Sequence, residues 1–275
     1  MTRATYIDPA DTARALLREL IARSRRATRL PSGADSWDAL PAPVTREFPY
    51  AHAPRLPEDD VIEPAQLFSP ALAQLDGPLE LEIGPGRGWF LVERLQAAPE
   101  VRMLGLEIRR KWATLVDDRL RARGFASRAR VFAEDARLAL PRFPDASLSV
   151  VYVHFPDPWW KKRHQKRLVL GAELLDQLAR VLVPDGKLLI QTDVEERATT
   201  YEALVSAHPA FAPATGTTPR IDDHPYGARS PRERRAMEDG LPIHRLHYRR
   251  RSGSLSTLPG SSLPGSTLLR SGEAP

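Results

Sequence analysis

Apolar and polar positions alternate with two different periods along the middle of the chain. Short apolar runs predict strands at residues 79–83, 101–106, 130–132, 148–153, 187–192 and 244–250. Stretches with one apolar face predict helices at residues 89–97, 109–123, 166–182 and 194–207, and a Pro-Asp-Gly turn at 184–186. Strands that alternate with helices imply βαβ units with right-handed crossovers. We therefore expect an α/β fold with a Rossmann-like, mostly parallel central sheet and helices on both faces.

The two ends of the chain differ in composition from this alternating region. Residues 1–75 are rich in Pro and Arg, which predicts a partly irregular N-terminal extension with one amphipathic helix at 11–23. Residues 76–250 hold the alternating elements and form the predicted folded domain. Residues 251–275 consist largely of Ser, Gly, Leu and Pro, a composition typical of a disordered tail.

Composition narrows the class of protein. The 275 residues include 42% hydrophobic side chains, enough for a core, and their net charge of +5 favours an anionic partner. The absence of cysteine excludes disulfides, thiolate nucleophiles and Cys-ligated zinc. The sequence has neither an apolar run of about 18 residues nor the plan of a signal peptide, so we expect a cytosolic protein without a membrane span. Monomer and homodimer both stay open.

A glycine-rich turn follows the first predicted strand and opens the first helix. It runs from Glu82 to Gly88, and Gly84, Gly86 and Gly88 permit a tight turn and close approach of the backbone to a ligand. Two further acidic residues stand at equivalent places, Glu107 after the second strand and Asp135 after the third. In parallel sheets ligands bind outside the carboxyl ends of the strands, where these residues fall. The other interpretation is that the acidic residues are solvated strand ends.

This layout resembles that of S-adenosylmethionine-dependent class I methyltransferases. The resemblance implies S-adenosylmethionine as cofactor, with Glu107 accepting hydrogen bonds from both ribose hydroxyls. It also implies that Asp135 faces the adenine amino group, and that Glu82 places negative charge near the methionine ammonium and sulfonium. A dinucleotide-dependent oxidoreductase would share the acid after the second strand. A further carboxylate would repel its pyrophosphate, so this alternative is remote.

The most specific motif begins at the end of the fourth predicted strand. Residues 155–167 read Phe-Pro-Asp-Pro-Trp-Trp-Lys-Lys-Arg-His-Gln-Lys-Arg. Here the chain resembles the tRNA (guanine-N7) methyltransferase family, whose members carry Phe-Pro-Asp-Pro-Trp followed by Lys, Arg-His and Lys-Arg at these spacings. The resemblance continues through residues 82–88, Glu107, Asp135 and Thr192-Asp193, and covers roughly residues 75–250.

By position, the resemblance assigns roles to the residues of the motif. Asp157 is implied as the catalytic carboxylate, next to the cofactor, and Lys161 and Asp193 as substrate-binding residues. The cations Lys162, Arg163, Lys166 and Arg167 are suited to neutralise RNA phosphates. The alternative for Arg163 and Arg167 is that they form the solvated first turn of the next helix.

A second box of the family is altered in this chain. The family's Thr-Lys-Phe-Glu aligns with residues 230–233, where Ser230 keeps a hydroxyl and Glu233 is retained as substrate-binding residues. Pro231 replaces the Lys and Arg232 replaces the Phe. Arg232 and Arg234 form a hypothetical substitute for the missing charge.

The resemblance implies an enzyme that methylates N7 of a guanine in the tRNA variable loop, producing 7-methylguanosine. The chemistry agrees, because guanine N7 carries a lone pair and no proton, so attack on a sulfonium methyl needs neither a metal nor a strong base. We expect no metal site. Two alternatives stay open: a divergent class I methyltransferase acting on another RNA or a small molecule, and a non-catalytic RNA-binding relative.

Overall fold

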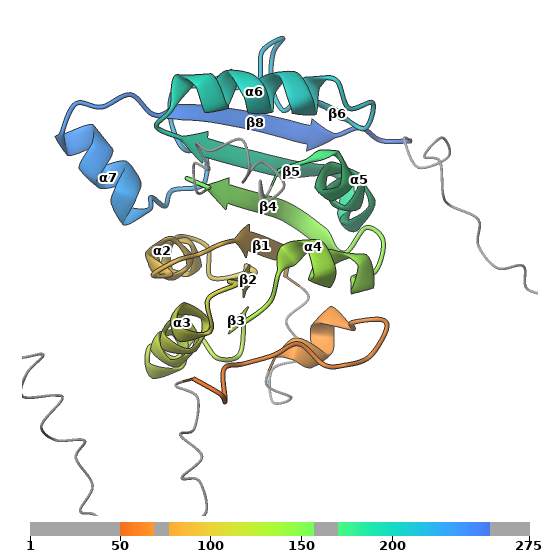
Figure 1. Ribbon diagram of the computed structural model, residues 1–275, viewed down its shortest axis with the longest axis vertical. Helices are drawn as coiled ribbons and strands as arrows, with labels where there is room; N and C mark the ends of the chain where they lie inside the picture. The colour runs from red at the N-terminus through yellow and green to blue at the C-terminus, as the bar shows by residue number, and fades with distance from the viewer. Residues whose placement is uncertain (1–49, 69–76, 157–169, 254–275) are drawn as a thin grey trace, which may run out of the picture. The chain divides into compact units, whose positions relative to one another are not determined.

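The computed structural model describes residues 50–68, 77–156 and 170–253, all within a compact unit that spans Phe48–Pro275 (Figure 1). Its strands are β1 (Leu79–Ile83), β2 (Arg102–Leu106), β3 (Ala129–Phe132), β4 (Leu148–His154), β5 (Leu182–Thr192), β6 (Phe211–Pro213), β7 (Arg220–Ile221) and β8 (His244–Arg250). Its α-helices are α2 (Trp89–Ala97), α3 (Arg110–Ala122), α4 (Ala136–Ala139), α5 (Ala172–Val181), α6 (Glu195–Ser206) and α7 (Pro231–Glu238). Two 3-10 turns are η2 (Pro64–Leu67) and η4 (Leu140–Arg142). Within the described ranges, every helix is too short or too polar to span a lipid bilayer.

The strands form one twisted sheet in the order β3-β2-β1-β4-β5-β8-β6, with β7 also paired to β8. Strands β1 to β5 are parallel, and β8 runs antiparallel to β5. The chain moves outward from β1 to β3 and then returns to place β4 on the other side of β1. The carboxyl ends of β1 and β4 therefore diverge at a topological switch point, where open α/β sheets bind ligands. The predicted α/β, mostly parallel fold is confirmed.

Two expected elements differ from the observed ones. The helix expected at 166–182 begins at Ala172, because the preceding Gly171 has an extended backbone. Residues 166–169 lie outside the described part of the chain. The turn expected at 184–186 lies inside β5, where Leu148 pairs with Leu182 but Val150 pairs with Lys187. The extra residues form a bulge, and Asp185 takes a left-handed φ of 61° there.

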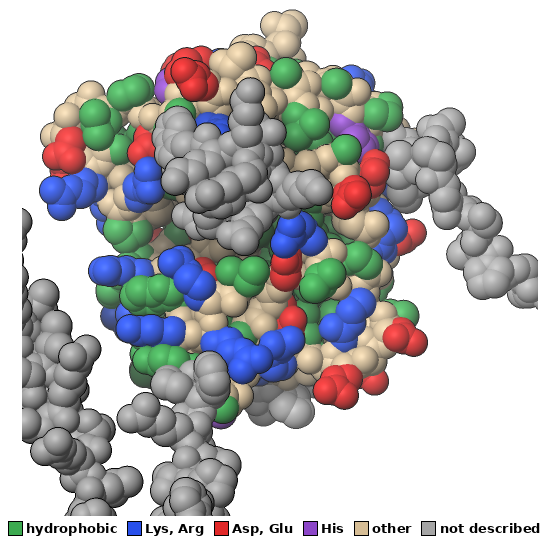
Figure 2. Space-filling view, in the orientation of Figure 1, with side chains coloured by type: hydrophobic (Ala, Val, Ile, Leu, Met, Phe, Trp, Pro, Cys, Tyr) green, Lys and Arg blue, Asp and Glu red, His purple; other side chains and the backbone are tan. Residues whose placement is uncertain are grey.

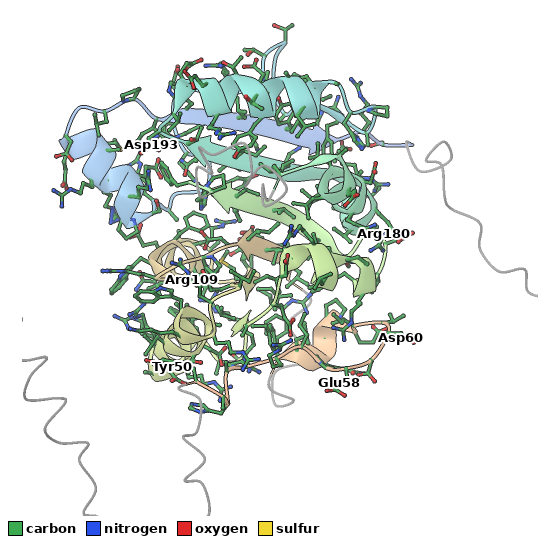
Figure 3. All side chains as sticks on the ribbon, viewed as in Figure 1. Tyr50, Glu58, Asp60, Arg109, Arg180 and Asp193 are labelled. Atoms are coloured by element: carbon green, nitrogen blue, oxygen red, sulfur yellow. The ribbon has the colours of Figure 1, made fainter. Side chains whose placement is uncertain are left out.

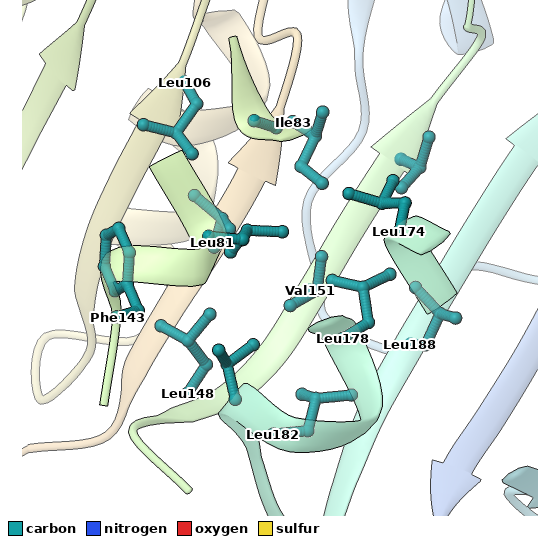
Figure 4. Packing of buried hydrophobic residues seen from close by; sticks show 14 of the residues in the cluster. Leu81, Ile83, Leu106, Phe143, Leu148, Val151, Leu174, Leu178, Leu182 and Leu188 are labelled. Atoms are coloured by element: carbon teal, nitrogen blue, oxygen red, sulfur yellow. The ribbon is translucent and has the colours of Figure 1, made fainter. Parts of the chain in front are cut away.

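Helices lie on both faces of the sheet (Figure 1), and alternate residues of a strand face opposite layers. Leu81 and Ile83 of β1 pack with the cluster that includes α4, α5 and α6 (Figure 4). Val150 and Tyr152 of β4 pack on the other face, with α2 and α3. Burying each large aliphatic side chain contributes about 1.5–3 kcal/mol, so both faces of the sheet help to hold it between the helices.

The segment 50–68, which we placed in the N-terminal extension, contributes to this core. Leu56, Ile62 and Phe68 are buried in the cluster with α4 and α5. Backbone hydrogen bonds from Ala133 to Pro54 and from Ile62 to Arg142, of 2.7 and 2.8 Å, fasten it to the segments around β3 and η4.

A buried ion pair ties β1 to α2 on the opposite face. Arg94 of α2 donates two hydrogen bonds to Glu80 of β1, at 2.9 and 2.7 Å, and the Tyr152 hydroxyl donates a third at 2.8 Å. Burial disfavours the charged guanidinium of Arg94, but the hydrogen bonds to Glu80 and the influence of Tyr152 outweigh it and raise the pKa of Arg94 above its usual range. The Arg94 guanidinium thus stays charged, and its hydrogen bonds to Glu80 orient the helix that follows the glycine-rich turn.

Replacing Arg94 by Met should lower the free energy of unfolding by about 3–5 kcal/mol, because it leaves the Glu80 carboxylate buried without its cation. Urea denaturation monitored by circular dichroism measures this change. The double variant Glu80→Gln with Arg94→Met is the control and should recover part of the loss. A single variant within about 1 kcal/mol of the parent would contradict the role of the pair.

Candidate active site

The carboxyl ends of β1 to β4 and the start of α7 surround a cavity of about 740 Å³. Its size lies within the range of small-molecule sites. The structure brings together around it six of the residues predicted from the sequence: Glu82, Gly84, Gly86, Glu107, Asp135 and Ser230. Three others do not line it: Gly88, Asp193 and Glu233. The remaining six lie outside the described residues: Asp157, Lys161, Lys162, Arg163, Lys166 and Arg167.

The glycine-rich turn borders the cavity with backbone atoms rather than with side chains. Gly84 and Gly86 take left-handed φ values of 72° and 54°, and a Cβ atom added to either would meet no atom within 4 Å. These two positions therefore leave open space on the cavity wall. Gly88 also has a left-handed φ, of 70°, but a Cβ there would lie 2.2 Å from Val116 of α3. Gly88 is thus required for packing of α3 against the turn.

Glu107 joins the end of β2 to the glycine-rich turn. Its Oε2 accepts a hydrogen bond from the Gly86 amide at 3.1 Å, and its Oε1 accepts from the amide and the guanidinium of Arg109, at 3.0 and 3.2 Å. The carboxylate is only 2% exposed although it borders the cavity. These contacts hold Glu107 in one orientation with lone-pair capacity left for a ligand.

Two acidic residues follow β3, Glu134 and Asp135, and each forms an ion pair with an arginine. Asp135 caps α4 through the Arg137 amide at 3.0 Å and accepts from the Arg137 guanidinium at 2.6 Å. Hydrogen bonds from the Arg137 side chain, against the opposing effect of partial burial, lower the pKa of Asp135. Glu134 pairs with Arg55 at 2.8 Å, which connects the segment 50–68 to the cavity wall.

Glu82 is buried and begins a chain of buried hydrogen bonds. Its Oε1 is 2.9 Å from Nδ1 of His154, the last residue of β4. Nε2 of His154 is 3.4 Å from Nε2 of His224, whose Nδ1 accepts from the Tyr226 amide at 3.3 Å. Because that amide can only donate, His224 carries its proton on Nε2 and donates it to His154. His154 then donates from Nδ1 to Glu82.

Electrostatics support this assignment. Burial, and after it the electrostatic influence of His154, Arg245 and Arg229, lowers the pKa of His224 to about 2, so the His224 ring is neutral. The second oxygen of Glu82, Oε2, is buried and has no hydrogen-bond partner among the described residues. A buried carboxylate oxygen without a partner is costly, so this atom is prepared for a donor from a bound molecule.

The mouth of the cavity contains an arginine in an unexpected pairing. Arg232 of α7 donates to both oxygens of Asp193, at 2.8 and 3.1 Å, and its guanidinium lies 5.3 Å from the centre of the Phe155 ring. Asp193 follows β5 and faces α7 (Figure 3). Phe155 has a left-handed φ of 47°, a strained value for a bulky residue. This strain lies at the end of β4, directly before the Pro-Asp-Pro sequence that begins at Pro156.

Ser230 and Glu233 have structural contacts. The Ser230 hydroxyl accepts a hydrogen bond from the Glu233 amide at 3.1 Å and caps α7, and Pro231 occupies the first turn. The Glu233 carboxylate is fully buried and pairs with Arg245 of β8 at 2.7 Å. The change from Lys to Pro at position 231 therefore suits the start of a helix. A substrate role for Ser230 and Glu233 stays a prediction.

Comparisons with known proteins agree with this geometry. The family model described as "Putative methyltransferase" matches residues 76–246. The tRNA (guanine-N(7)-)-methyltransferase of Rhodopirellula baltica is 35% identical over 248 residues, which cover 86% of this chain and 83% of that protein. Proteins of the same name from Myxococcus xanthus and Anaeromyxobacter dehalogenans are 38% and 41% identical, each covering 62% of this chain and 82% and 84% of their own lengths.

The chain belongs to the tRNA (guanine-N(7)-)-methyltransferase family. This confirms the resemblance that residues 155–167 indicated, and with it the class I methyltransferase fold. Sequence reasoning about this family member missed His154, His224 and Arg109. A signal existed for Arg109, which follows Glu107 at the start of a helix. His224 had none, because its partner His154 is far away in sequence.

Lowering the pH from 7 to 5 should reduce the stability of the protein. An unfolded histidine has a pKa of about 6.5, whereas burial lowers the pKa of His224 to about 2 and that of His247 to about 4. Below about 6.5 the unfolded chain takes up protons that the folded chain does not, so each of these histidines reduces stability by up to about 1.4 kcal/mol per pH unit.

Chemical denaturation of the parent and of His224→Gln between pH 5 and 7 measures this slope. The variant should have the shallower slope, by the contribution of one histidine. The exposed His52, replaced by Gln, is the matched control and should leave the slope as in the parent. Equal slopes for the parent and His224→Gln would refute the neutral assignment.

Proposed function

We propose that this protein transfers a methyl group from S-adenosylmethionine to N7 of a guanine in the variable loop of tRNA, producing 7-methylguanosine. The observation that carries the proposal is the meeting of Glu82, Glu107 and the turn at Gly84 and Gly86 around one cavity, at the switch point of the sheet. The names of the relatives supply the acceptor. With tRNA as substrate, we expect the enzyme to work in the cytoplasm.

The residues present fit the methyl donor. S-adenosylmethionine supplies an electrophilic methyl group on a sulfonium. The unpartnered Oε2 of Glu82 is suited to accept a hydrogen bond from the donor's ammonium and to balance its charge. Glu107 is suited to bind ribose hydroxyls, and the open space at Gly84 and Gly86 lets the backbone lie close to the ligand. Asp135, which follows the third strand, is proposed to face the adenine amino group.

The reaction asks little of the protein beyond positioning. Guanine N7 has a lone pair in the plane of the ring and no proton to remove, so an in-line attack needs no general base. Holding the two reactants in line can contribute about 7–11 kcal/mol to lowering the barrier. Asp157, which lies outside the described residues, is proposed as the carboxylate that orients the guanine. Asp193 is the second acceptor proposed for the edge that carries N1–H and the exocyclic amine.

One observation favours a second candidate function. Arg232 already pairs with Asp193, although this carboxylate is proposed to read the guanine edge. The pair must open, or Asp193 must keep only its remaining lone pairs for the base. A divergent methyltransferase with another RNA acceptor would account for the exchange of the family's Phe for Arg at position 232.

The deciding experiment is transfer of labelled methyl from S-adenosylmethionine to unmodified tRNA, with the modified base identified after digestion. We expect 7-methylguanine in tRNA, and none in a tRNA whose variable loop lacks guanine. Label in a different base, or in another RNA but not in tRNA, would replace the proposed function with the second candidate.

Two carboxylates are expected to affect different quantities: Glu82 affects the affinity for the methyl donor, and Asp157 affects turnover. Glu82→Gln keeps the shape and the acceptor for His154 but removes the negative charge, so donor affinity measured by calorimetry should fall about 10- to 100-fold, since a charged hydrogen bond contributes about 1.5–3 kcal/mol. Asp157→Ala should leave donor affinity near that of the parent and reduce turnover. The reverse result, with donor affinity abolished only in Asp157→Ala, would exchange the two assignments.

A further inference from the structure

Five cations lie on α3 or in the segments that flank α2 and α3, and none of them has a carboxylate partner among the described residues. We call this surface the α2–α3 basic face and define its cations as Arg87, Arg110, Lys111, Arg119 and Arg123. Within the described part of the chain, no Asp or Glu lies within ion-pair distance of these five side chains. Of the neighbouring cations on α3, Arg121 is neutralised by Asp117 at 3.0 Å and does not belong to the group.

Arginines on other parts of the described surface are mostly paired. Arg220 contacts Glu195 and Glu202, at 3.0 and 2.7 Å. Arg249 contacts Asp185 at 3.1 Å, and Arg235 contacts Asp239 at 3.5 Å. An arginine-rich composition alone would distribute unpaired charge over the whole surface. Like charges on one face repel each other, so a cluster of unpaired cations indicates a surface that binds an anion.

Two tryptophans are interleaved with these cations. The guanidinium groups of Arg119 and Arg123 lie 4.9 and 5.2 Å from the ring centre of Trp89. Arg87 and Lys111 lie 5.4 and 5.7 Å from that of Trp112. Figure 2 shows Lys and Arg side chains alternating with hydrophobic ones over α2 and α3. The indole rings hold the flexible cations in place, which reduces the conformational entropy that binding must remove.

The face begins at the mouth of the cavity. Arg87 lines the cavity itself, and α3 starts directly after Arg109, which lines it as well. The 13 residues of α3 extend about 20 Å away from that mouth. A nucleic acid with one base in the cavity would have its neighbouring phosphates outside, within reach of a cationic strip of this length.

We propose that the α2–α3 basic face binds the phosphate backbone of the RNA whose base enters the cavity. This proposal rests on the proposed function for the identity of that RNA as tRNA. The unpaired cations neutralise successive phosphates, and the edges of Trp89 and Trp112 offer contact to exposed ribose or base. The cations of this face are different residues from those at 161–167, to which the sequence assigns the same task.

The test neutralises three exposed cations that do not line the cavity, in the variant Arg110→Gln, Lys111→Gln, Arg123→Gln. The slope of log K against log salt is negative, and each phosphate that the variant no longer neutralises should reduce its magnitude by about 0.7–0.9. Three such phosphates therefore lower the slope by about two to three, and at 0.1 M salt tRNA binding weakens about 100-fold. Fluorescence anisotropy with labelled tRNA over a range of salt concentrations measures both quantities on the full chain.

Two matched variants control for net charge and for side-chain identity. Arg220→Gln, Arg249→Gln, Arg251→Gln removes three cations from elsewhere on the surface and should keep the parent's salt slope. The second control, Arg110→Lys, Lys111→Arg, Arg123→Lys, keeps the charge of the face. Its salt slope should also equal that of the parent. Circular dichroism and donor binding, measured on each variant, should match the parent.

The outcomes separate this proposal from the proposed function. A fall in tRNA affinity in the first variant, with both controls unchanged, supports the face whether or not methyl transfer to tRNA is observed. An unchanged affinity and slope in the first variant overturns the face, even if the parent methylates tRNA. Equal falls in the first variant and in the Arg220, Arg249, Arg251 control also overturn it, because the effect would then be one of net charge. A parent that binds no tRNA overturns it too.

Discussion

Two carboxylates, Glu80 and Glu82, are buried on the same face of β1, and the structure depends on how the charge of each is compensated. Glu80 receives hydrogen bonds from Arg94 and Tyr152, which bind β1, β4 and α2 into one unit. Glu82 receives only His154 and keeps one oxygen without a partner in the described structure. A buried charge is costly unless it is paired. The first carboxylate therefore stabilises the fold, while the second is held ready for a ligand.

The strand order of the sheet places Glu82 beside the cavity. Because β1 lies between β2 and β4, the segments that follow these strands separate and leave the cavity at their carboxyl ends. The glycine-rich turn supplies backbone without side chains, Glu107 connects that turn to β2, and His154 supports Glu82 from β4. The strained Phe155 follows β4 directly and is the first residue of the motif that indicated the family.

Arginine has different functions in different parts of this arginine-rich protein. Buried or half-buried guanidinium groups, such as those of Arg94 and Arg245, satisfy carboxylates inside the domain. At the cavity mouth Arg232 occupies a carboxylate that the acceptor base is proposed to use. Pairing thus determines which cations serve the fold and which stay available to an anionic partner, and this distinction depends on neighbours in space.

The sequence by itself determined the alternating elements, because the periods of β1, α2 and β8 are local properties of the chain. It also determined that Glu82, Glu107 and Asp135 would share one edge, since parallel strands point their carboxyl ends the same way. Only the tertiary structure decided the partners. His224 meets His154 across 70 residues, and Glu233 meets Arg245 of β8 rather than the cavity. Hydrogen bonds and burial depend on positions in space, which no local pattern of residues contains.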